Sequence, residues 1–353
     1  MRRIVHLASG REWRGGQRQT WLLTRELQRL GVDQVLVTAR VSELARRAAA
    51  DGVPVRPVAW TAGLDPRAWW AARAEARRAP AILHAHDGHA VTIARWAADA
   101  ATPWLATRRN VTPLRRPAGW QDAARVVAIS NAVRAQLLRD GLRAERIVVV
   151  HSAIDLEATR ATPHEDLRAW ARLPNGGALI VTVAAVTPEK GLDLLPLTLK
   201  GLAADHDVRW VVVGDGPLRT DLQHLAREWG LADRLFLPGH HPDPVRLLRD
   251  ADLFVLPSTS EGLGTSILDA LALDLPVVAT RSGGVEDILQ NGAGLLVPVG
   301  DAQALAQAVA RMLDDAELRR RTVEAGRAAV TRFGVTAMAA AMRTVYDSVA
   351  ANR

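Results

Sequence analysis

The chain has 353 residues, of which 48% are hydrophobic and 24% are charged, and it contains no cysteine. This composition excludes a disordered chain, a disulfide scaffold and any metal site built on thiolates. The length favours two α/β domains over one, because a single hydrophobic core usually stops growing below about 300 residues.

The N-terminal segment is a short strand-like run without the apolar core of a signal peptide. No later stretch approaches the ~20 apolar residues that span a bilayer. We therefore expect a cytoplasmic protein that is either soluble or held peripherally on the cytoplasmic face of the membrane.

The net charge of +7 is unevenly distributed along the chain. Residues 1–163 contain 26 Lys or Arg against 14 Asp or Glu, whereas the remainder contains 19 against 24. A basic first half suggests an anionic partner, such as a phospholipid surface, a lipid-phosphate acceptor or nucleic acid. An equal alternative is that these arginines only keep an Arg-rich protein in solution.

Short Val/Ile/Leu runs alternate with helical patterns along the whole chain, which is typical of βαβ units and parallel sheets. In the first half these runs predict strands near 3–8, 33–38, 55–58, 81–85, 103–107, 125–129 and 146–150. In the second half they predict strands near 178–184, 208–213, 234–237, 252–256, 276–279 and 294–297. Several runs are apolar on both faces, as expected of strands that helices cover on both sides.

A polar segment that begins near Ala161 separates the two series of strands. We therefore predict one domain over residues 1–163 and a second over 164–334. Residues 335–353 form an Ala-rich helical pattern, which we expect to cross back and pack on the first domain.

Two features of the first half mark candidate site residues. Gly15 and Gly16 open a predicted helix, although a Gly-Gly pair alone usually indicates only a turn. His84 and His86, at the end of a predicted strand, share one face, and Asp87 takes the other. Because no further ligand cluster accompanies them, we expect no metal.

Two stretches of the first half combine arginine with tryptophan. Residues 66–78 form an amphipathic helix with paired indoles, and residues 107–120 form a loop dense in cations. This composition suits a membrane interface, but it equally suits partly buried indoles with solvated arginines. Arg108 and Arg109 are also candidates to bind an anionic group of an acceptor.

The most specific pattern lies between Asp252 and Thr280. A buried strand is followed by a loop of glycines and small hydroxyl residues, and then by a helix. Free amides and the helix dipole at such a helix start favour an anion, and we expect a diphosphate there. Two acidic residues, Glu261 and Asp269, lie eight positions apart around this site.

Residues 252–280 resemble the C-terminal signature of family-4 glycosyltransferases, which have the GT-B fold. Further similarity covers essentially the whole chain. It includes the strand and loop ending at Lys190-Gly191, the turn around Gly214 and Gly216, the blocks at 281–288 and 294–298, and the two strands that close the first half.

The resemblance implies two Rossmann-like domains whose parallel sheets face a central cleft. It also implies transfer of a sugar from a nucleotide donor with retention of configuration and without a divalent ion. Lys190 would neutralise the diphosphate as it leaves, Glu261 would bind sugar hydroxyls and Asp269 the ribose. His86 would position the transferred sugar, and Asp87 is the alternative residue for orienting or deprotonating the acceptor hydroxyl.

The resemblance implies that the donor is a UDP-, GDP- or ADP-sugar and that no other cofactor is needed. The acceptor would be a glycan or lipid-linked molecule in lipopolysaccharide or surface-polysaccharide assembly, and the enzyme a hexosyl- or heptosyltransferase. The residues expected to bind the donor are Gly15, Gly16, Gly214, Gly216, Gly262, Leu263, Gly264, Thr265, Ser266 and Asp269.

Three positions depart from the family pattern. Ala185 occupies the place of an arginine that usually accompanies the lysine. Asp269 replaces a glutamate and is one methylene shorter. Ser152-Ala153 replaces an Asn-Gly pair. Either another cation serves the diphosphate, or Lys190 acts with backbone amides alone.

Other functions fit the sequence less well. A sugar-nucleotide epimerase of the same fold is the nearest alternative. A phosphorylase would need a late pyridoxal-binding lysine, and no lysine follows Lys200. A non-catalytic nucleic-acid-binding protein has only the basic charge in its favour, so we expect no nucleic-acid partner. Hydride transfer is disfavoured because no Gly-x-Gly-x-x-Gly follows the first strand.

Overall fold

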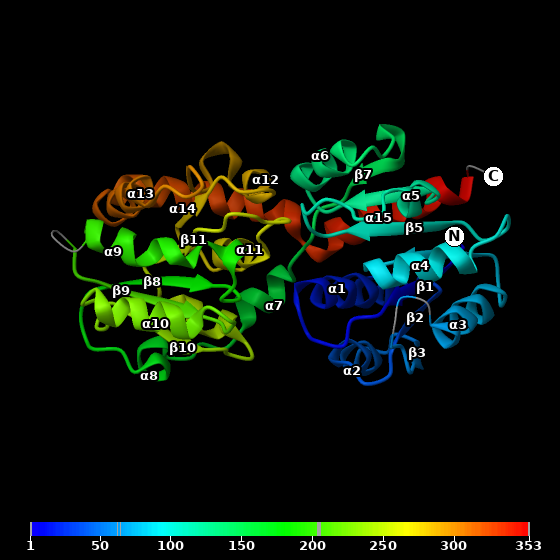
Figure 1. Ribbon diagram of the computed structural model, residues 1–353, viewed down its shortest axis with the longest axis horizontal. Coiled ribbons are helices and arrows are strands. Elements are labelled where there is room, and N and C mark those ends of the chain that lie inside the picture. The colour runs from blue at the N-terminus through cyan, green and yellow to red at the C-terminus, as the bar shows by residue number, and fades with distance from the viewer. Residues whose placement is uncertain (1, 62, 64, 203–205, 352–353) are drawn as a thin grey trace. The chain divides into compact units, whose positions relative to one another are not determined.

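The computed structural model describes residues 2–61, 63, 65–202 and 206–351, and the chain divides into two compact units (Figure 1). Unit 1 is Met1–Ala153 with Phe333–Arg353, and unit 2 is Ile154–Arg332. The division thus falls ten residues earlier than the sequence suggests. The reason is that α7 (Leu156–Ala161) packs on α11 (Thr265–Ala272), where Nε of Arg160 donates to the Ala272 carbonyl at 3.3 Å.

Unit 1 is built on a seven-stranded parallel sheet with the strand order β3-β2-β1-β4-β5-β6-β7. Its strands are β1 (Arg3–Ala8), β2 (Gln34–Ala39), β3 (Val55–Val58), β4 (Ala81–Ala85), β5 (Trp104–Arg108), β6 (Arg125–Ala128) and β7 (Ile147–Val149). Its α-helices are α1 (Gly15–Arg29), α2 (Glu43–Ala50), α3 (Pro66–Ala76), α4 (Gly88–Ala97), α5 (Ala118–Gln121), α6 (Asn131–Arg139) and α15 (Val335–Ala351).

The helix α15 joins unit 1 from the far end of the sequence. It packs against α1 and β4 and contributes Met338, Met342 and Tyr346 to the hydrophobic core of this unit. Residues 352–353, at the end of the predicted C-terminal helix, lie outside the described residues. The core of unit 1 therefore contains residues from both ends of the chain.

Unit 2 is built on a six-stranded parallel sheet with the strand order β10-β9-β8-β11-β12-β13. Its strands are β8 (Ala178–Val183), β9 (Val208–Val213), β10 (Leu235–Gly239), β11 (Leu253–Leu256), β12 (Val277–Thr280) and β13 (Leu295–Val297). Besides α7 and α11, its α-helices are α8 (Leu167–Ala171), α9 (Leu195–Leu202), α10 (Arg219–Glu228), α12 (Val285–Leu289), α13 (Ala302–Asp314) and α14 (Ala316–Val330).

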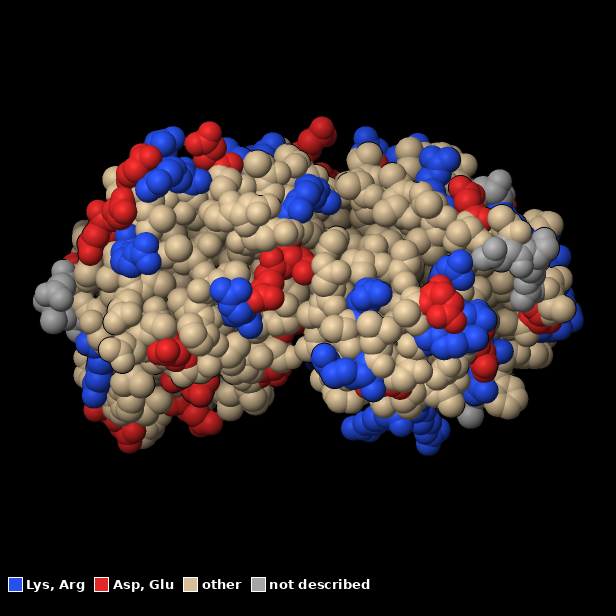
Figure 2. Space-filling view, turned by 90° about the horizontal axis from the view of Figure 1, so that it is seen from above, with Lys and Arg blue, Asp and Glu red and all other residues tan. Residues whose placement is uncertain are grey.

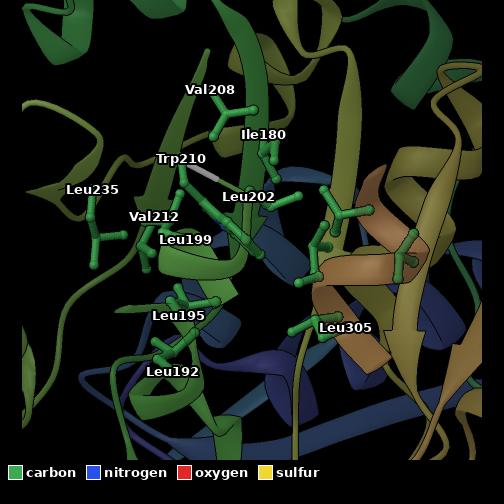
Figure 3. Close-up of a cluster of buried hydrophobic side chains, with 14 of the residues drawn as sticks. Ile180, Leu192, Leu195, Leu199, Leu202, Val208, Trp210, Val212, Leu235 and Leu305 are labelled. Carbon is green, nitrogen blue, oxygen red and sulfur yellow. The ribbon is translucent and has the colours of Figure 1, made fainter. Parts of the chain in front are cut away.

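Trp210 of β9 lies at the centre of the core of unit 2 (Figure 3). Its ring is fully buried among leucines of α9 and α13, and its Nε1 donates to Oγ1 of Thr182 at 3.1 Å. A buried indole N–H needs such a partner, because leaving it unpaired would cost about 1–3 kcal/mol. The hydroxyl of Thr182 in turn donates to the carbonyl of Val255, at 2.6 Å, on the neighbouring β11.

Both parallel sheets confirm the expected fold class of two Rossmann-like domains. Each of the predicted strand regions overlaps an observed strand. In the described part of the chain, no helix combines the length and the hydrophobicity that a membrane span requires.

Charge separates more sharply between the units than between halves of the sequence. Unit 1 carries 27 Lys or Arg against 13 Asp or Glu, a net of +14, and unit 2 carries 18 against 25, a net of −7. On the face shown in Figure 2, basic side chains are prominent on unit 1 and acidic side chains gather on unit 2. The basic excess therefore belongs to one folded unit.

Candidate functional site

Each sheet has one point at which the strand order reverses. In unit 1 this point lies between β1 and β4, and in unit 2 between β8 and β11. Loops that leave neighbouring parallel strands in opposite directions form a crevice at the carboxyl ends, where ligands of such folds bind. The candidate residues follow these strands: His86 and Asp87 follow β4, Lys190 follows β8 and Glu261 follows β11.

In unit 2 the structure brings Lys190 and Glu261 together. Nζ of Lys190 lies 2.5 Å from Oε1 of Glu261, and the hydroxyl of Ser258 donates to the same oxygen at 2.8 Å. Both side chains are largely buried: that of Glu261 is 9% exposed and that of Lys190 is 20% exposed. Within the described residues Oε2 of Glu261 has no hydrogen bond, so this oxygen remains available to a ligand.

The two loops that carry this pair are held together by backbone contacts. The amides of Thr259 and Ser260 donate to the Glu189 carbonyl at 2.9 and 3.2 Å. On the other side, the amide of Gly284 donates to the Glu261 carbonyl at 3.2 Å. The position of the ion pair is therefore set by the sheet and does not depend on flexible side chains alone.

Helix α11 begins next to Glu261 with free backbone donors. Gly264 precedes it in the left-handed conformation, at φ of 89°, and neither a side-chain cap nor an acid occupies its first turn. The amide of Ile267 donates to the Gly264 carbonyl at 3.0 Å, so it is not available to an anion. The amides that can meet the expected diphosphate are therefore those before Ile267, including the amides of Thr265 and Ser266.

The other residues of unit 2 that are expected to bind the donor are mostly buried or closely packed. Leu263 and Asp269 are buried, at 2% and 5% exposure, and Gly262 is half-buried. Gly214 and Gly216 lie where the turn after β9 meets the loop after β8. A Cβ at these positions would lie 1.9 Å from the Ala184 carbonyl and 2.4 Å from the Val186 carbonyl. Close backbone packing thus explains both glycines without a ligand.

Asp87, in unit 1, uses its carboxylate to hold two loops together. It caps α4 by accepting from the amide of Ala90 at 2.9 Å. It also accepts from the amide of Ser9 at 2.6 Å and from the Ser9 hydroxyl at 2.7 Å. These bonds tie the end of β1 to the start of α4, which suits a positioning role better than proton transfer.

Three buried histidines lie beside Asp87. His6 of β1 pairs in register with His84 of β4, and the rings of His84 and His86 are 3.9 Å apart. This proximity confirms that His84 and His86 share one face. Nδ1 of His6 lies 3.0 Å from Nε2 of His86. Both nitrogens of His84 also have partners, Tyr346 of α15 at 2.8 Å and Thr107 at 2.7 Å.

Arg109 determines the direction of the hydrogen bonds in this cluster. Its Nη2 lies 3.3 Å from Nδ1 of His86, and a guanidinium can only donate. The ring proton of His86 is therefore on Nε2, from which it is donated to Nδ1 of His6. The proton of His6 is consequently on its Nε2. Both nitrogens of His86 are thus engaged, and neither is free to act as a base.

Burial keeps all three imidazoles neutral. It lowers the pKa of His6 to about 3 and lowers the pKa values of His84 and His86 well below their usual range. The positive charge of Arg109 acts in the same direction on His84 and His86. Burial likewise raises the pKa of Tyr346 well above its usual value. Near neutral pH the cluster is therefore an uncharged hydrogen-bonded network.

Within the described residues this trio is the one group of three His, Asp or Glu side chains close enough to surround a metal ion. Its ligand atoms lie within 4.8 Å of one another. The donor set fits a metal poorly, because the nitrogens of His84 and His86 already have partners. A dication would also stand beside the guanidinium of Arg109, which would repel it.

Gly15 and Gly16 begin α1 next to Arg109. A Cβ at Gly16 would lie 3.5 Å from Cδ of Arg109, whereas one at Gly15 would meet no atom within 4 Å. The first turn of α1 has no side-chain cap and no acid. The predicted Gly-Gly loop is therefore an open helix start with a cation beside it.

The sequence alone did not single out His6 or Tyr346. His6 lies two residues before the end of β1, in a position that looks like an ordinary strand interior. Only the pairing of β1 with β4, together with the return of α15, shows that both residues reach His84. The one feature of the sequence that could have indicated His6 is that it is a polar residue in an otherwise apolar part of β1.

Two family models match adjoining parts of the chain. The model for Glycosyltransferase Family 4 matches residues 13–158, and the model for glycosyl transferases group 1 matches residues 164–329. The two together cover most of both units.

Curated relatives are similar over part of their length. A 2-deoxystreptamine glucosyltransferase of Streptomyces kanamyceticus is 33% identical over 67% of this chain and 62% of its own. The lipopolysaccharide core biosynthesis glycosyltransferase LpsE of Rhizobium meliloti is 32% identical over 45% of this chain and 46% of its own. The chain thus spans less than two thirds of either relative.

Among solved structures, that of HepE from Anabaena in complex with UDP-glucose has a TM-score of 0.85 at 20% identity. The match covers 99% of this chain and 100% of HepE. At this identity the likeness establishes the fold alone, and it confirms the two-domain GT-B architecture.

Proposed function

The chain belongs to the family-4 glycosyltransferases of the GT-B fold, and from this premise we propose that it transfers a sugar from a nucleotide-diphosphate sugar to an acceptor hydroxyl. The relatives named above are a glucosyltransferase and a lipopolysaccharide core glycosyltransferase. HepE, which shares the fold, was solved with UDP-glucose. The finer assignments below rest on the geometry of the two sites.

The observation that carries the proposal is the ion pair of Lys190 and Glu261 beside the start of α11. The diphosphate accepts hydrogen bonds from the amides of Thr265 and Ser266, and the ammonium of Lys190 stabilises its charge as it leaves. Oε2 of Glu261 binds hydroxyls of the transferred sugar, and Asp269 binds the ribose. The donor is a UDP-, GDP- or ADP-sugar.

We assign His86 to positioning the donor sugar, because both of its nitrogens already have partners in the buried network. A base other than His86 must then take the acceptor proton, and the departing phosphate serves. This course retains the anomeric configuration and requires no divalent ion. Asp87 holds the loop on which His86 lies.

The proposed enzyme is a hexosyl- or heptosyltransferase of lipopolysaccharide or surface-polysaccharide assembly. LpsE acts in lipopolysaccharide core biosynthesis, which supports this setting. The acceptor is a glycan or lipid-linked molecule. The net charge of +14 on unit 1 suits work at the anionic cytoplasmic face of the membrane.

A panel of nucleotide sugars tests the proposal directly. Thermal unfolding is followed with UDP-, GDP- and ADP-sugars at one ionic strength, because a ligand that binds only the folded protein raises its melting temperature. We expect the sugars of one nucleotide to raise the melting temperature of the wild type. The same nucleotide sugars should have little effect on the melting temperature of Lys190→Gln. If none of the nucleotides shifts the wild type, the chain does not use a nucleotide-sugar donor.

A further inference from the structure

An open groove lies between α2 and β3 in unit 1. β3 is the terminal strand in the order of this sheet, and α2 packs against it and against β2. The groove has a volume of about 800 Å³, and apolar side chains form much of its lining. They are Val41, Ala45 and Ala49 from the start and the length of α2, and Val55 and Pro57 from β3. The edge of the sheet is therefore a partly apolar surface.

Val41 extends this apolar surface towards the solvent. It lies between the end of β2 and the start of α2, and its side chain is 83% exposed. A single exposed valine needs no explanation, but Val41 continues the lining of a groove. Removing such a surface from water is favourable. The groove therefore suits a partner that has an apolar part.

Arginines surround the same groove. Arg11, Arg40 and Arg46 line it together with one acid, Glu43. Glu43 is already engaged, because it accepts from Nε of Arg46 at 2.8 Å and from Nε of Arg47 at 2.7 Å. Among the described residues, no carboxylate forms an ion pair with Arg11 or Arg40. The partner of the groove should therefore be anionic as well as apolar.

The helix α3, which the sequence suggests for a membrane interface, is less suitable. Its Trp70 is 64% exposed, but three arginines of residues 66–78 have acidic partners. The pairs are Arg67 with Asp65 at 2.9 Å, Arg73 with Asp99 at 3.4 Å and Arg78 with Glu75 at 3.5 Å. Their charges are largely compensated within the protein, whereas those of Arg11 and Arg40 are not.

We propose that the α2–β3 groove, defined by the residues above, binds unit 1 to an anionic phospholipid bilayer. Val41 enters the headgroup layer, and Arg11 and Arg40 contact lipid phosphates. Nucleic acid is also anionic, but its phosphate backbone offers no apolar partner to Val41. The inference rests on the membrane setting of the proposed function and names the surface that makes the contact.

Sedimentation of the full chain with vesicles tests this surface. Vesicles of phosphatidylglycerol and phosphatidylcholine in equal parts are compared with pure phosphatidylcholine, at one ionic strength and without nucleotide. We expect the wild type to bind only the anionic vesicles. Arg40→Glu and Val41→Asp should each bind them at least about 5-fold more weakly, the effect of about one basic residue at such a surface. Both side chains are exposed, and circular dichroism verifies that the variants are folded.

Two variants serve as matched controls. Arg115→Glu changes the charge of unit 1 by the same amount as Arg40→Glu, and it lies in the cationic loop 107–120. Trp70→Ser removes the exposed indole of α3. Both should bind the anionic vesicles as the wild type does, because neither residue lines the groove.

Three results would overturn the inference. Full binding by Arg40→Glu and Val41→Asp would show that the groove does not contact the bilayer. An equal loss in Arg115→Glu would show that overall charge attracts the vesicles. A wild-type dimer in analytical ultracentrifugation that Val41→Asp dissociates would assign the groove to a second copy of the chain. Because the assay contains no nucleotide, failure of the wild type to bind any nucleotide sugar would refute the donor assignment and leave the vesicle comparison valid.

Discussion

Nζ of Lys190 lies 2.5 Å from Oε1 of Glu261, although 71 positions separate the two residues in the chain. The contact exists because β8 and β11 are neighbours in the sheet, and each residue lies in the loop that follows its strand. Loops at this point of the strand order diverge, so their first residues face one crevice. The ion pair thus lies at the crevice in which ligands of such folds bind.

Removing either member of this pair should impair transfer more than folding. We expect Lys190→Gln and Glu261→Ala each to lower kcat at least about 100-fold, as the loss of one preorganised electrostatic contact does in other enzymes. Because the two groups share one hydrogen bond, the double variant should be less impaired than the product of the single effects. Steady-state kinetics with the identified donor measure this. Near-normal transfer by Glu261→Ala would contradict its assigned role.

Gly283 should be irreplaceable for the position of Glu261. Its φ is 55°, and a Cβ there would lie 1.8 Å from the Glu261 carbonyl. Gly300 also has a positive φ, of 80°, but a Cβ there would meet no atom within 4 Å. We expect Gly300→Ala to lose about 1 kcal/mol of unfolding free energy from backbone strain alone. Gly283→Ala should lose at least about 2 kcal/mol more and bind UDP weakly.

Urea unfolding of the two alanine variants, with UDP titrations of each, checks this difference. Equal stability of Gly283→Ala and Gly300→Ala would mean that the Glu261 loop moves aside at little cost. The close approach of Gly283 to the Glu261 carbonyl would then not be what fixes the position of Glu261.

The buried histidines should make folding stability depend on pH. The folded pKa of His6, about 3, lies below its usual value of 6.5, so the unfolded chain takes up a proton that the native state excludes. Stability from this residue is therefore complete above about pH 6.5 and is lost as the pH falls towards 3. The slope is about 1.4 kcal/mol for each pH unit.

Urea unfolding of wild type and His6→Gln between pH 7 and 4 tests this expectation. The unfolding free energy of the variant should fall less steeply with decreasing pH, because the variant has lost one group that takes up a proton only in the unfolded chain. Identical slopes for wild type and His6→Gln would show that His6 is protonated in the folded protein.

Tyr346 should connect the C-terminal helix to the candidate site. Its hydroxyl lies 2.8 Å from Nδ1 of His84, and the side chain is fully buried. Tyr346→Phe removes this partner, and we expect a loss of about 1–3 kcal/mol of unfolding free energy.

Because the chain has one tyrosine, phenolate absorbance reports on this residue alone. Burial raises its pKa, so absorbance should rise only at the pH at which the protein unfolds. A phenolate signal near the ordinary tyrosine pKa in the folded protein would show that the hydroxyl is exposed.

Local patterns in the sequence were sufficient to locate the strands and the loops that follow them. Apolar runs such as that of β11 identify buried strands without tertiary information, because their hydrophobicity is set by the covering helices. The glycine and hydroxyl residues before α11 likewise mark a helix start with free amides. The resemblance to family-4 glycosyltransferases could be drawn from such local segments in their order.

The partners of the site residues were decided only by the tertiary structure. Asp87 was selected by residue type alone, and only the structure shows that its carboxylate accepts hydrogen bonds from Ser9 and from the amide of Ala90. His6 and Tyr346 reach His84 from positions 78 residues before it and 262 residues after it, the second contact being made through α15. Which strands pair, and which helix returns, depends on the packing of the whole core. That packing cannot be predicted from a short stretch of sequence, because it involves residues far apart in the chain.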